Sequence, residues 1–324
     1  MTVPVAVYFA AFVVAFFSAA GALPLWRRWC VKTNLVDDPG HRKIHHTPIP
    51  LAGGLAVFTG LAVPILLGIA VVQLGLLTAD LNEALRYGFG RRSLQLIGIL
   101  GGAVGMLLIG FADDKWELKP AIKFSAQLAV ALIVAACGVR ITLFVPNLLF
   151  SYFITVLWIL TVINAFNFMD NMNGLCSGLG AIAGFLFGLI AALSGQYLVA
   201  LLSFTIAGAL LGFLPFNFPK ASAFLGDAGS HLVGFLMAIS AILPSFYSLK
   251  NPNTWAVLSP LLILAVPLAD LVIVVILRWR MGKPFYVGDT NHLSHRLVRN
   301  GLTQRRAVIL IWGMALLVGA LAFL

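Results

Sequence analysis

The sequence predicts an all-α, polytopic membrane protein with about ten transmembrane helices. Hydrophobic residues make up 61% of the 324 residues and charged residues only 10%, whereas a soluble domain has about a quarter charged residues. The apolar residues form runs of about 20, the length that crosses a bilayer as a helix. Because these runs fill the chain, we expect a single membrane domain over residues 1–324 and no separate soluble domain.

The expected spans follow one another closely along the chain. The first has no basic region before its apolar stretch and is too long for a signal peptide, so we expect it to be retained. Cys30, Cys137 and Cys176 lack the spacing of a metal site or disulfide and are expected to fill apolar space. The expected spans are residues 3–25, 51–72, 93–112, 121–137, 148–166, 175–193, 197–214, 230–246, 255–277 and 307–324.

Basic residues are concentrated in every second loop between these spans. All but five of the 21 lysines and arginines lie in or beside the odd-numbered loops. Positively charged loops stay in the cytoplasm, so we expect the odd loops there and both chain ends outside. The net charge of +10 follows from this bias and from the anionic inner leaflet. It requires no nucleic-acid partner.

Acidic residues collect in the same loops, which the positive-inside rule does not explain because it concerns lysine and arginine. Only Asp80 and Glu83 lie in an even loop, and Asp270 lies within the ninth span. A bound cation or a phosphorylated substrate would account for these carboxylates, whereas the alternative is that they are solvated and neutralise nearby bases. The acids of the odd loops are Asp37, Asp38, Asp113, Asp114, Glu117, Asp170, Asp227 and Asp289.

The third loop carries two adjacent carboxylates at the end of a span. Asp113 and Asp114 point about 100° apart on a helix, so one can hold a metal while the other accepts a proton. An isolated pair would favour a simple polar helix end. Lys123 weakens that interpretation, because an ammonium at membrane depth needs an anionic partner and this one lies across a short turn from the acids.

The fifth loop carries Asn164, Asn167, Asp170 and Asn173, which are spaced by three. On a helix this spacing makes each side chain a neighbour of the next, so we expect a slanted polar stripe. Its oxygens suit Mg²⁺ or Mn²⁺. They also suit hydrogen bonds to a nucleobase or sugar, and a polar helix cap is the alternative.

The seventh loop places Asp227 between glycines at a helix start. It can cap the helix or expose its carboxylate to a metal, and the sequence favours neither. His231 is expected to be packed or to face a pore. In the first loop, Asp37 and Lys43 precede prolines and a glycine pair that could help bind a diphosphate.

The ninth loop offers nitrogen donors for a phosphate. His292, His295 and Arg296 share one helical face, whereas a zinc site and binding to the membrane surface are the alternatives. Asp270 is a functional candidate because it is ionisable within a span, with Arg278 or Lys123 as its expected partner. Together the odd loops supply oxygen ligands for a metal ion, a candidate base, and side chains that can donate hydrogen bonds to a phosphate. These are the groups that phosphoryl transfer uses.

These motifs resemble those of the polyprenyl-phosphate N-acetylhexosamine-1-phosphate transferase superfamily, glycosyltransferase family 4. The likeness is closest to the bacterial branch that starts O-antigen, enterobacterial common antigen or teichoic acid synthesis. It extends from Leu35 to Leu297 and is carried by LVDDPGHRK with PIPLAGG, GFADDKWELKPAIKFSAQ, NAFNFMDNMNGL, FLGDAGS, and RWRMGKPF with DTNHLSHRL.

The resemblance implies transfer of a sugar-1-phosphate, GlcNAc-1-phosphate foremost, from a UDP-N-acetylhexosamine to undecaprenyl phosphate with release of UMP. It implies Mg²⁺ or Mn²⁺ as cofactor and a cytoplasm-facing site in the inner membrane, as a first step of cell-envelope polysaccharide synthesis. By motif position, Asp113 deprotonates the lipid phosphate or attacks as nucleophile, Asp114 supports it or the metal, and Asp227 with Asn167 binds the metal. The implied substrate-binding residues are Asp170, Asn173, Lys123, His292, His295, Arg296, Lys43 and Asp37.

Two positions depart from the family pattern. Many bacterial relatives have Asp where this chain has Asn173, and Ser294 replaces one imidazole of the usual histidine run. Alternatives are the same reaction with UDP-FucNAc, UDP-QuiNAc or UDP-MurNAc-pentapeptide, an ion-coupled transporter, and an inactive scaffold. A homodimer remains open.

Overall fold

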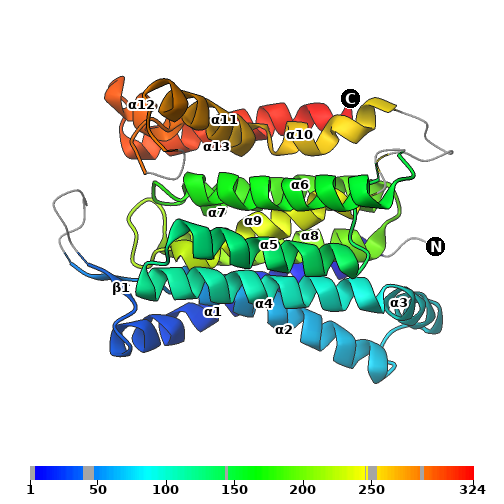
Figure 1. Ribbon diagram of the computed structural model, residues 1–324. Coiled ribbons are helices and arrows are strands. Elements are labelled where there is room, and N and C mark those ends of the chain that lie inside the picture. Colours follow the sequence, from blue (N-terminus) through cyan, green and yellow to red (C-terminus); the bar gives the residue numbers. More distant parts are fainter. Residues whose placement is uncertain (1–3, 39–46, 143–144, 245, 247–253, 285–287) are drawn as a thin grey trace.

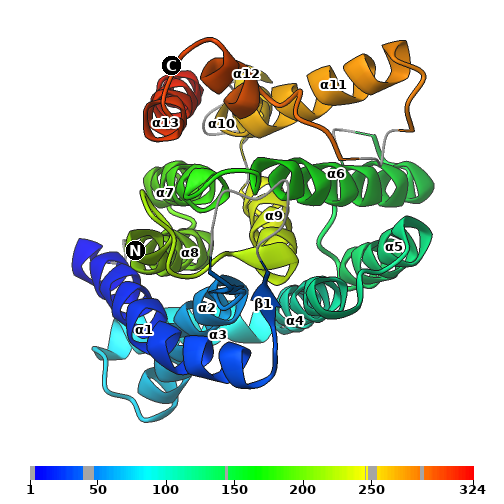
Figure 2. The same cartoon turned by 90° about the vertical axis from the view of Figure 1, so that its left-hand side faces the viewer.

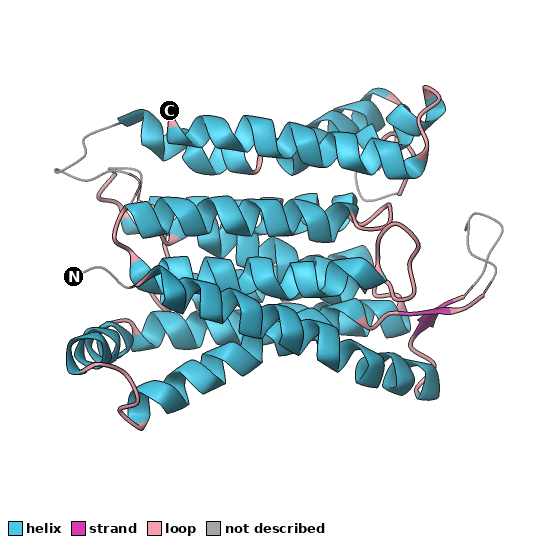
Figure 3. Ribbon diagram, turned by 180° about the vertical axis from the view of Figure 1, so that it is seen from behind, coloured by secondary structure: helices cyan, strands magenta, loops and turns pink. Residues whose placement is uncertain are grey.

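The computed structural model describes residues 4–38, 47–142, 145–244, 246, 254–284 and 288–324. Figure 3 shows that the described chain is nearly all helix, with one short pair of antiparallel strands, β1 (Val36–Asp37) and β2 (Ile49–Pro50). The α-helices are α1 (Val5–Lys32), α2 (Gly53–Gln73), α3 (Ala79–Arg91), α4 (Ser93–Trp116), α5 (Pro120–Ala136), α6 (Leu148–Met169), α7 (Leu175–Leu193), α8 (Tyr197–Phe213), α9 (Gly226–Ile242), α10 (Ser259–Ile263), α11 (Ala265–Arg280), α12 (Leu293–Arg299) and α13 (Gln304–Ala320). Three 3₁₀ helices cover Leu214–Phe216, Thr254–Leu258 and Leu321–Phe323.

Each expected span overlaps a helix, and the chain is a multi-pass membrane protein. Within the described residues, seven helices are long and apolar enough to cross a bilayer, or eight if α10 and α11 form one broken span. The ninth expected span is therefore not straight, because these two helices meet at 66°. Two further expected spans correspond to α5 and α9, which are apolar but only 17 residues long.

α9 forms the centre of the molecule. All of its residues except Asp227 and Ile242 are buried, because α2, α4, α6 and α7 pack around it. Small residues allow this close approach. A Cβ at Gly54 of α2 would overlap the backbone of Gly229, and a Cβ at Gly110 of α4 would overlap the carbonyl oxygen of Asp227.

The last four α-helices lie together on one side of this bundle (Figures 1 and 2). α11 packs on α6, and α13 packs on α7. The indole of Trp312 in α13 occupies the space beside Gly178, where a Cβ would collide with it. Its ring lies 4.8 Å from that of Phe218, measured between centroids.

The ends of the helices separate the loops into two faces. The end of α4, the start of α5, the end of α6 and the start of α12 lie at one end of the molecule, and α3, the start of α1 and the C-terminus lie at the other (Figure 1). The described parts of the odd-numbered loops therefore share one face, as predicted. The helix α3 was not expected, because its sequence is too polar to be a span.

Candidate active site

The site is built where α4 crosses the start of α9. Gly110 lets α4 touch the α9 backbone, and Asp114 follows one turn later. Both carboxylate oxygens of Asp114 accept backbone hydrogen bonds, from Asp227 N at 2.8 Å and from Ala228 N at 3.0 Å. Asp114 therefore supplies the first amides of α9 with acceptors, a role that the sequence offered to Asp227 itself. Asp227 lies in the first turn with its carboxylate free for other partners.

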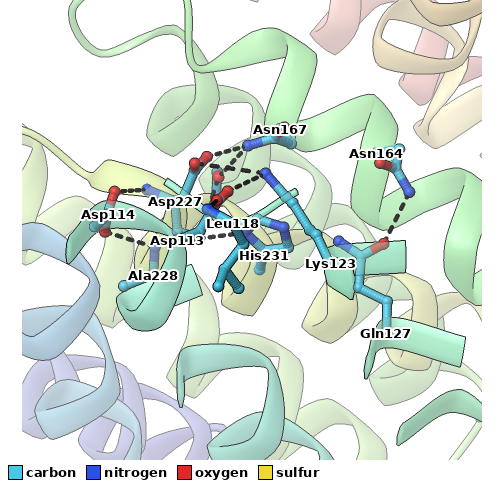
Figure 4. A network of polar contacts seen from close by, with 11 residues as sticks. Asp113, Asp114, Leu118, Lys123, Gln127, Asn164, Asn167, Asp227, Ala228 and His231 are labelled. Atoms are coloured by element: carbon cyan, nitrogen blue, oxygen red, sulfur yellow. Dashed lines mark hydrogen bonds and ion pairs between the residues drawn. The ribbon is translucent and has the colours of Figure 1, made fainter. Parts of the chain in front are cut away.

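Lys123 lies between two carboxylates (Figure 4). Its Nζ is 2.6 Å from Asp113 Oδ2 and 3.5 Å from Asp227 Oδ2. The second oxygen of Asp113 accepts a hydrogen bond of 2.9 Å from Leu118 N, which fixes the turn between α4 and α5. The expected pairing of Lys123 with the third-loop acids is confirmed. It also reaches Asp227, which lies 104 positions further along the chain.

Asn167 at the end of α6 completes this cluster. Its amide donates to Asp227 Oδ1 and, at 2.9 Å, to Ser230 Oγ. His231 is fully buried below, with Nδ1 hydrogen-bonded to the carbonyl of Asp227, as expected for a packed histidine. Four helices thus each contribute a polar side chain to one point, and we call Asp113, Asp114, Lys123, Asn167 and Asp227 the acidic cluster.

The expected stripe of four residues on one helix is wrong. α6 ends at Met169, so only Asn164 and Asn167 lie on the helix. Asn164 donates to Gln127 Oε1 at 3.2 Å instead of facing the acids. Asn173, in the following turn, donates to the carbonyl of Pro219 at 3.3 Å. The chain turns at this point because Gly174 takes a positive φ of 75°.

Asp170 is the member of this segment that stays electrostatically close to the cluster. Burial raises its pKa well above the usual range, and the negative charges of Asp227 and Asp114 raise it further. A protonated carboxyl group can donate a hydrogen bond, which an ionised carboxylate cannot.

A second group of polar side chains joins α11 to the start of α12 and the loop before it. Asp270 accepts from His292 Nδ1 at 2.7 Å and from Leu293 N at 2.6 Å. The expected partners of Asp270, Arg278 and Lys123, are therefore wrong. Arg278 instead donates to Asp289 Oδ2 at 3.1 Å, and Lys123 belongs to the acidic cluster.

The three residues of the ninth loop that were expected to donate hydrogen bonds to a phosphate lie at the start of α12 and differ in burial. His292 precedes α12 and is buried against Asp270, whereas Arg296 is exposed. The rings of His292 and His295 are 6.3 Å apart between centroids. Ser294 is buried and donates to Asn171 Oδ1 at 2.6 Å, so the hydroxyl at this position ties α12 to the loop after α6.

The first-loop residues lie at the edge of the site or outside the described chain. Asp37 is in β1 and pairs with Ile49. The strand pair leads to Pro50, whose carbonyl accepts from Phe224 N at 3.0 Å, three residues before Asp227. The glycines Gly53 and Gly54 serve close helix packing and not an open phosphate loop. Lys43 lies outside the described residues.

Comparisons with known proteins identify the family. The model of glycosyl transferase family 4 matches residues 96–245. The chain is 31% identical to the "Probable undecaprenyl-phosphate N-acetylglucosaminyl 1-phosphate transferase" of Bacillus subtilis, over 93% of this chain and 80% of that protein. This chain belongs to glycosyl transferase family 4.

Two further relatives of this family carry related names. The chain is 33% identical to the "Decaprenyl-phosphate N-acetylglucosaminephosphotransferase" of Mycobacterium tuberculosis strain H37Rv, over 89% of this chain and 74% of that protein. It is 29% identical to the "Undecaprenyl-phosphate alpha-N-acetylglucosaminyl 1-phosphate transferase" of Escherichia coli K12, over 92% of this chain and 78% of that protein. The chain is therefore a glycosyl-1-phosphate transferase, and the transporter alternative is set aside.

The acidic cluster is not sealed inside the helix bundle. Asp113 and Asp227 remain partly exposed beside the Lys123 ammonium. The sequence missed Ser230 and Phe168, although both lie within motifs that it singled out. Their partners are distant in sequence, so no local spacing could have indicated them.

Proposed function

We propose that this transferase moves GlcNAc-1-phosphate from UDP-GlcNAc to undecaprenyl phosphate and releases UMP. The observation that carries the proposal is the acidic cluster, in which Asp113 and Asp227 share one ammonium at the end of membrane-spanning helices. The names of the relatives support N-acetylglucosamine and a polyprenyl phosphate as substrates. This reaction is the first membrane step of building a cell-envelope polysaccharide, such as an O-antigen or a teichoic acid.

In the proposed mechanism, Asp113 accepts the proton of the lipid phosphate, whose oxygen then attacks the sugar-linked phosphorus of the donor. UMP leaves as the bond within the diphosphate breaks. Lys123 compensates negative charge where two phosphorylated substrates meet. Asp114 acts by anchoring the start of α9, which holds Asp227 in place.

Mg²⁺, or Mn²⁺, is the proposed cofactor. Among the described residues, no three side chains of His, Cys, Asp or Glu are grouped to hold a metal ion. Mg²⁺ usually binds one or two carboxylates together with substrate phosphates. Asp227 and Asn167 would hold it, and when bound it would neutralise charge on the donor diphosphate. Their oxygens are the donor type that this hard cation prefers.

The remaining substrate contacts are proposed from the positions of the residues in the family motifs. Asp170 and Asn173 lie beyond the end of α6, where the nucleotide of the donor would bind. His292, His295 and Arg296 would contact phosphates or the sugar from α12, and Asp37 and Lys43 would act from the first loop. Asn173 suits a hydrogen-bonding role, since its amide already donates to a carbonyl.

We further infer ten spans, with α5, α9 and the broken pair α10–α11 each crossing the inner membrane. The face that carries the acidic cluster is then cytoplasmic. This agrees with the concentration of lysine and arginine in the loops of the same face. UDP-sugars are made in the cytoplasm, so this orientation places the donor and the site on the same side.

The test is an assay of purified protein with undecaprenyl phosphate, Mg²⁺ and a panel of UDP-N-acetylhexosamines. We expect UMP release and a lipid-linked GlcNAc-phosphate with UDP-GlcNAc. Asp113→Asn should lower the rate by at least about 100-fold, the lower end of the range for a general base. A product only with another donor would revise the sugar, and no product with any donor or metal would exclude the proposal.

Glu117→Gln is the matched control for this substitution. It also removes one acidic charge from the third loop, but Glu117 is exposed at the end of α4. Its rate should stay within about twofold of the parent enzyme, because an exposed charge is screened by solvent. An equal loss in both variants would mean that the loop needs net charge and not a base at Asp113.

A further inference from the structure

Asp270 is the acceptor for two donors from the start of α12. His292 donates through Nδ1 and the next residue, Leu293, donates through its backbone amide, each to a different carboxylate oxygen. The side chains of Asp270 and His292 are only 2% and 6% exposed. One carboxylate thus fixes both the ring of His292 and the backbone that carries it.

The His292 ring is held from a second direction by Phe168. The two rings meet edge to face at 5.4 Å between centroids. The guanidinium of Arg278 lies over the same Phe168 ring at 4.7 Å. Phe168 directly follows Asn167, so the last turn of α6 has the acidic cluster on one side and His292 on the other.

We propose that Asp270 is a positioning residue of the transferase, which keeps Nδ1 of His292 protonated and leaves Nε2 as the ring atom that meets a substrate phosphate. That a substrate phosphate meets Nε2 rests on the proposed function. It adds a residue 22 positions away from the histidine and inside α11.

The chemistry follows from the two hydrogen bonds. A carboxylate can only accept, so the ring nitrogen facing it must carry the proton. When the ring binds a second proton, Nε2–H is the donor that remains for a phosphate oxygen. Buried partners that orient a functional histidine in this way fix both its tautomer and its direction.

The tautomer can be measured without any activity. We would label the histidines of the full-length protein with ¹⁵N and identify the His292 signals as those absent from His292→Gln. The expected result is a protonated Nδ1 in the parent enzyme. An unprotonated Nδ1 with a protonated Nε2 would overturn the inference, whatever the enzyme's activity.

Asp270→Asn tests the functional part. Asparagine has one acceptor oxygen for two donors, so the protonated Nδ1 fraction should fall, and kcat should drop by about 10-fold to 100-fold, the usual range for such partners. In a His292→Gln background the same change should cost less than about twofold, because its effect passes through the imidazole. An equal loss in both backgrounds would overturn the inference.

Asp289→Asn is the matched control. It also removes a carboxylate from this region, but Asp289 pairs with Arg278 and not with His292. We expect it to leave the His292 tautomer unchanged and to have the same effect in both backgrounds. A parent enzyme with protonated Nδ1 but no transfer with any donor would contradict the proposed function and leave the Asp270–His292 geometry standing.

Discussion

Asp114 and Asp227 perform separately two roles that the sequence offered as alternatives for Asp227. An aspartate between glycines at a helix start normally caps its own helix. Here the cap comes from α4, because Asp114 accepts the amides of Asp227 and Ala228. The carboxylate of Asp227 is thereby released to meet Lys123 and Asn167. Local sequence cannot distinguish these cases, since the deciding contact spans 113 positions.

Asp170 gives a prediction about pH and stability. Its pKa is raised by burial first, then by Asp227 and Asp114. The folded protein therefore keeps a proton that the unfolded chain has released, so stability falls as pH rises above the usual aspartate range. Asp170→Asn cannot ionise, and the variant should lose less of its Tm between about pH 4 and pH 8. Thermal unfolding in detergent with a metal chelator measures this.

Asp289→Asn serves as the comparison, because the pKa of Asp289 is shifted in the opposite direction to that of Asp170. Burial alone would raise the pKa of Asp289, but hydrogen bonds from Asn291 and Arg278 outweigh it and the pKa is lowered. Its stabilisation is present above the usual aspartate pKa and is lost as pH falls through the lowered value. Identical pH slopes for the parent protein and Asp170→Asn would contradict the prediction for Asp170.

At the scale of elements, the close crossing of α4 and α9 sets the geometry of the acidic cluster. A Cβ at Gly110 would overlap the carbonyl oxygen of Asp227 and crowd Ala228. Gly110→Ala should therefore push the start of α9 away from Asp114 and reduce transfer by at least about tenfold, since small displacements at a reacting centre are costly. The measurement is the rate of UMP release by protein that still elutes as a single species.

Gly101→Ala is the control on the same helix. A Cβ there meets no atom within 4 Å, so the variant should keep parental activity. It should also be no less stable, because alanine favours helix more than glycine does. If Gly110→Ala is as active as Gly101→Ala, the crossing is looser than the contact indicates.

The elements themselves were largely predictable, because hydropathy reports directly on the need to bury a helix in lipid. Every expected span overlaps a helix. The helix that was missed, α3, is polar and short enough to look like a loop. The break between α10 and α11 was missed because Leu264 and its neighbours are as apolar as the rest of the span. The pairing of Asp270 with His292 depends on how α11 and α12 pack in the folded chain, so the spacing of the two residues in the sequence could not predict it.

At the scale of the whole molecule, α4 connects the two faces. Its 24 residues extend about 36 Å, slightly more than the hydrocarbon core. The acidic cluster is at its last turn, and α3 with Arg91 precedes its first. A substrate that enters from the cytoplasm can reach the cluster only if the Lys115 end of α4 is cytoplasmic.

Cysteine labelling decides this orientation. We would replace Cys30, Cys137 and Cys176 and introduce Arg91→Cys or Lys115→Cys. Both positions are exposed, Arg91 at the end of α3 just before α4 and Lys115 in the last turn of α4. A membrane-impermeant maleimide should label Arg91→Cys in intact cells and Lys115→Cys only after permeabilisation. Equal labelling of both after permeabilisation is the control for reactivity. The reverse pattern would put the acidic cluster outside, away from cytoplasmic UDP-sugars, and would contradict the proposed orientation because the basic loops would then face the wrong side.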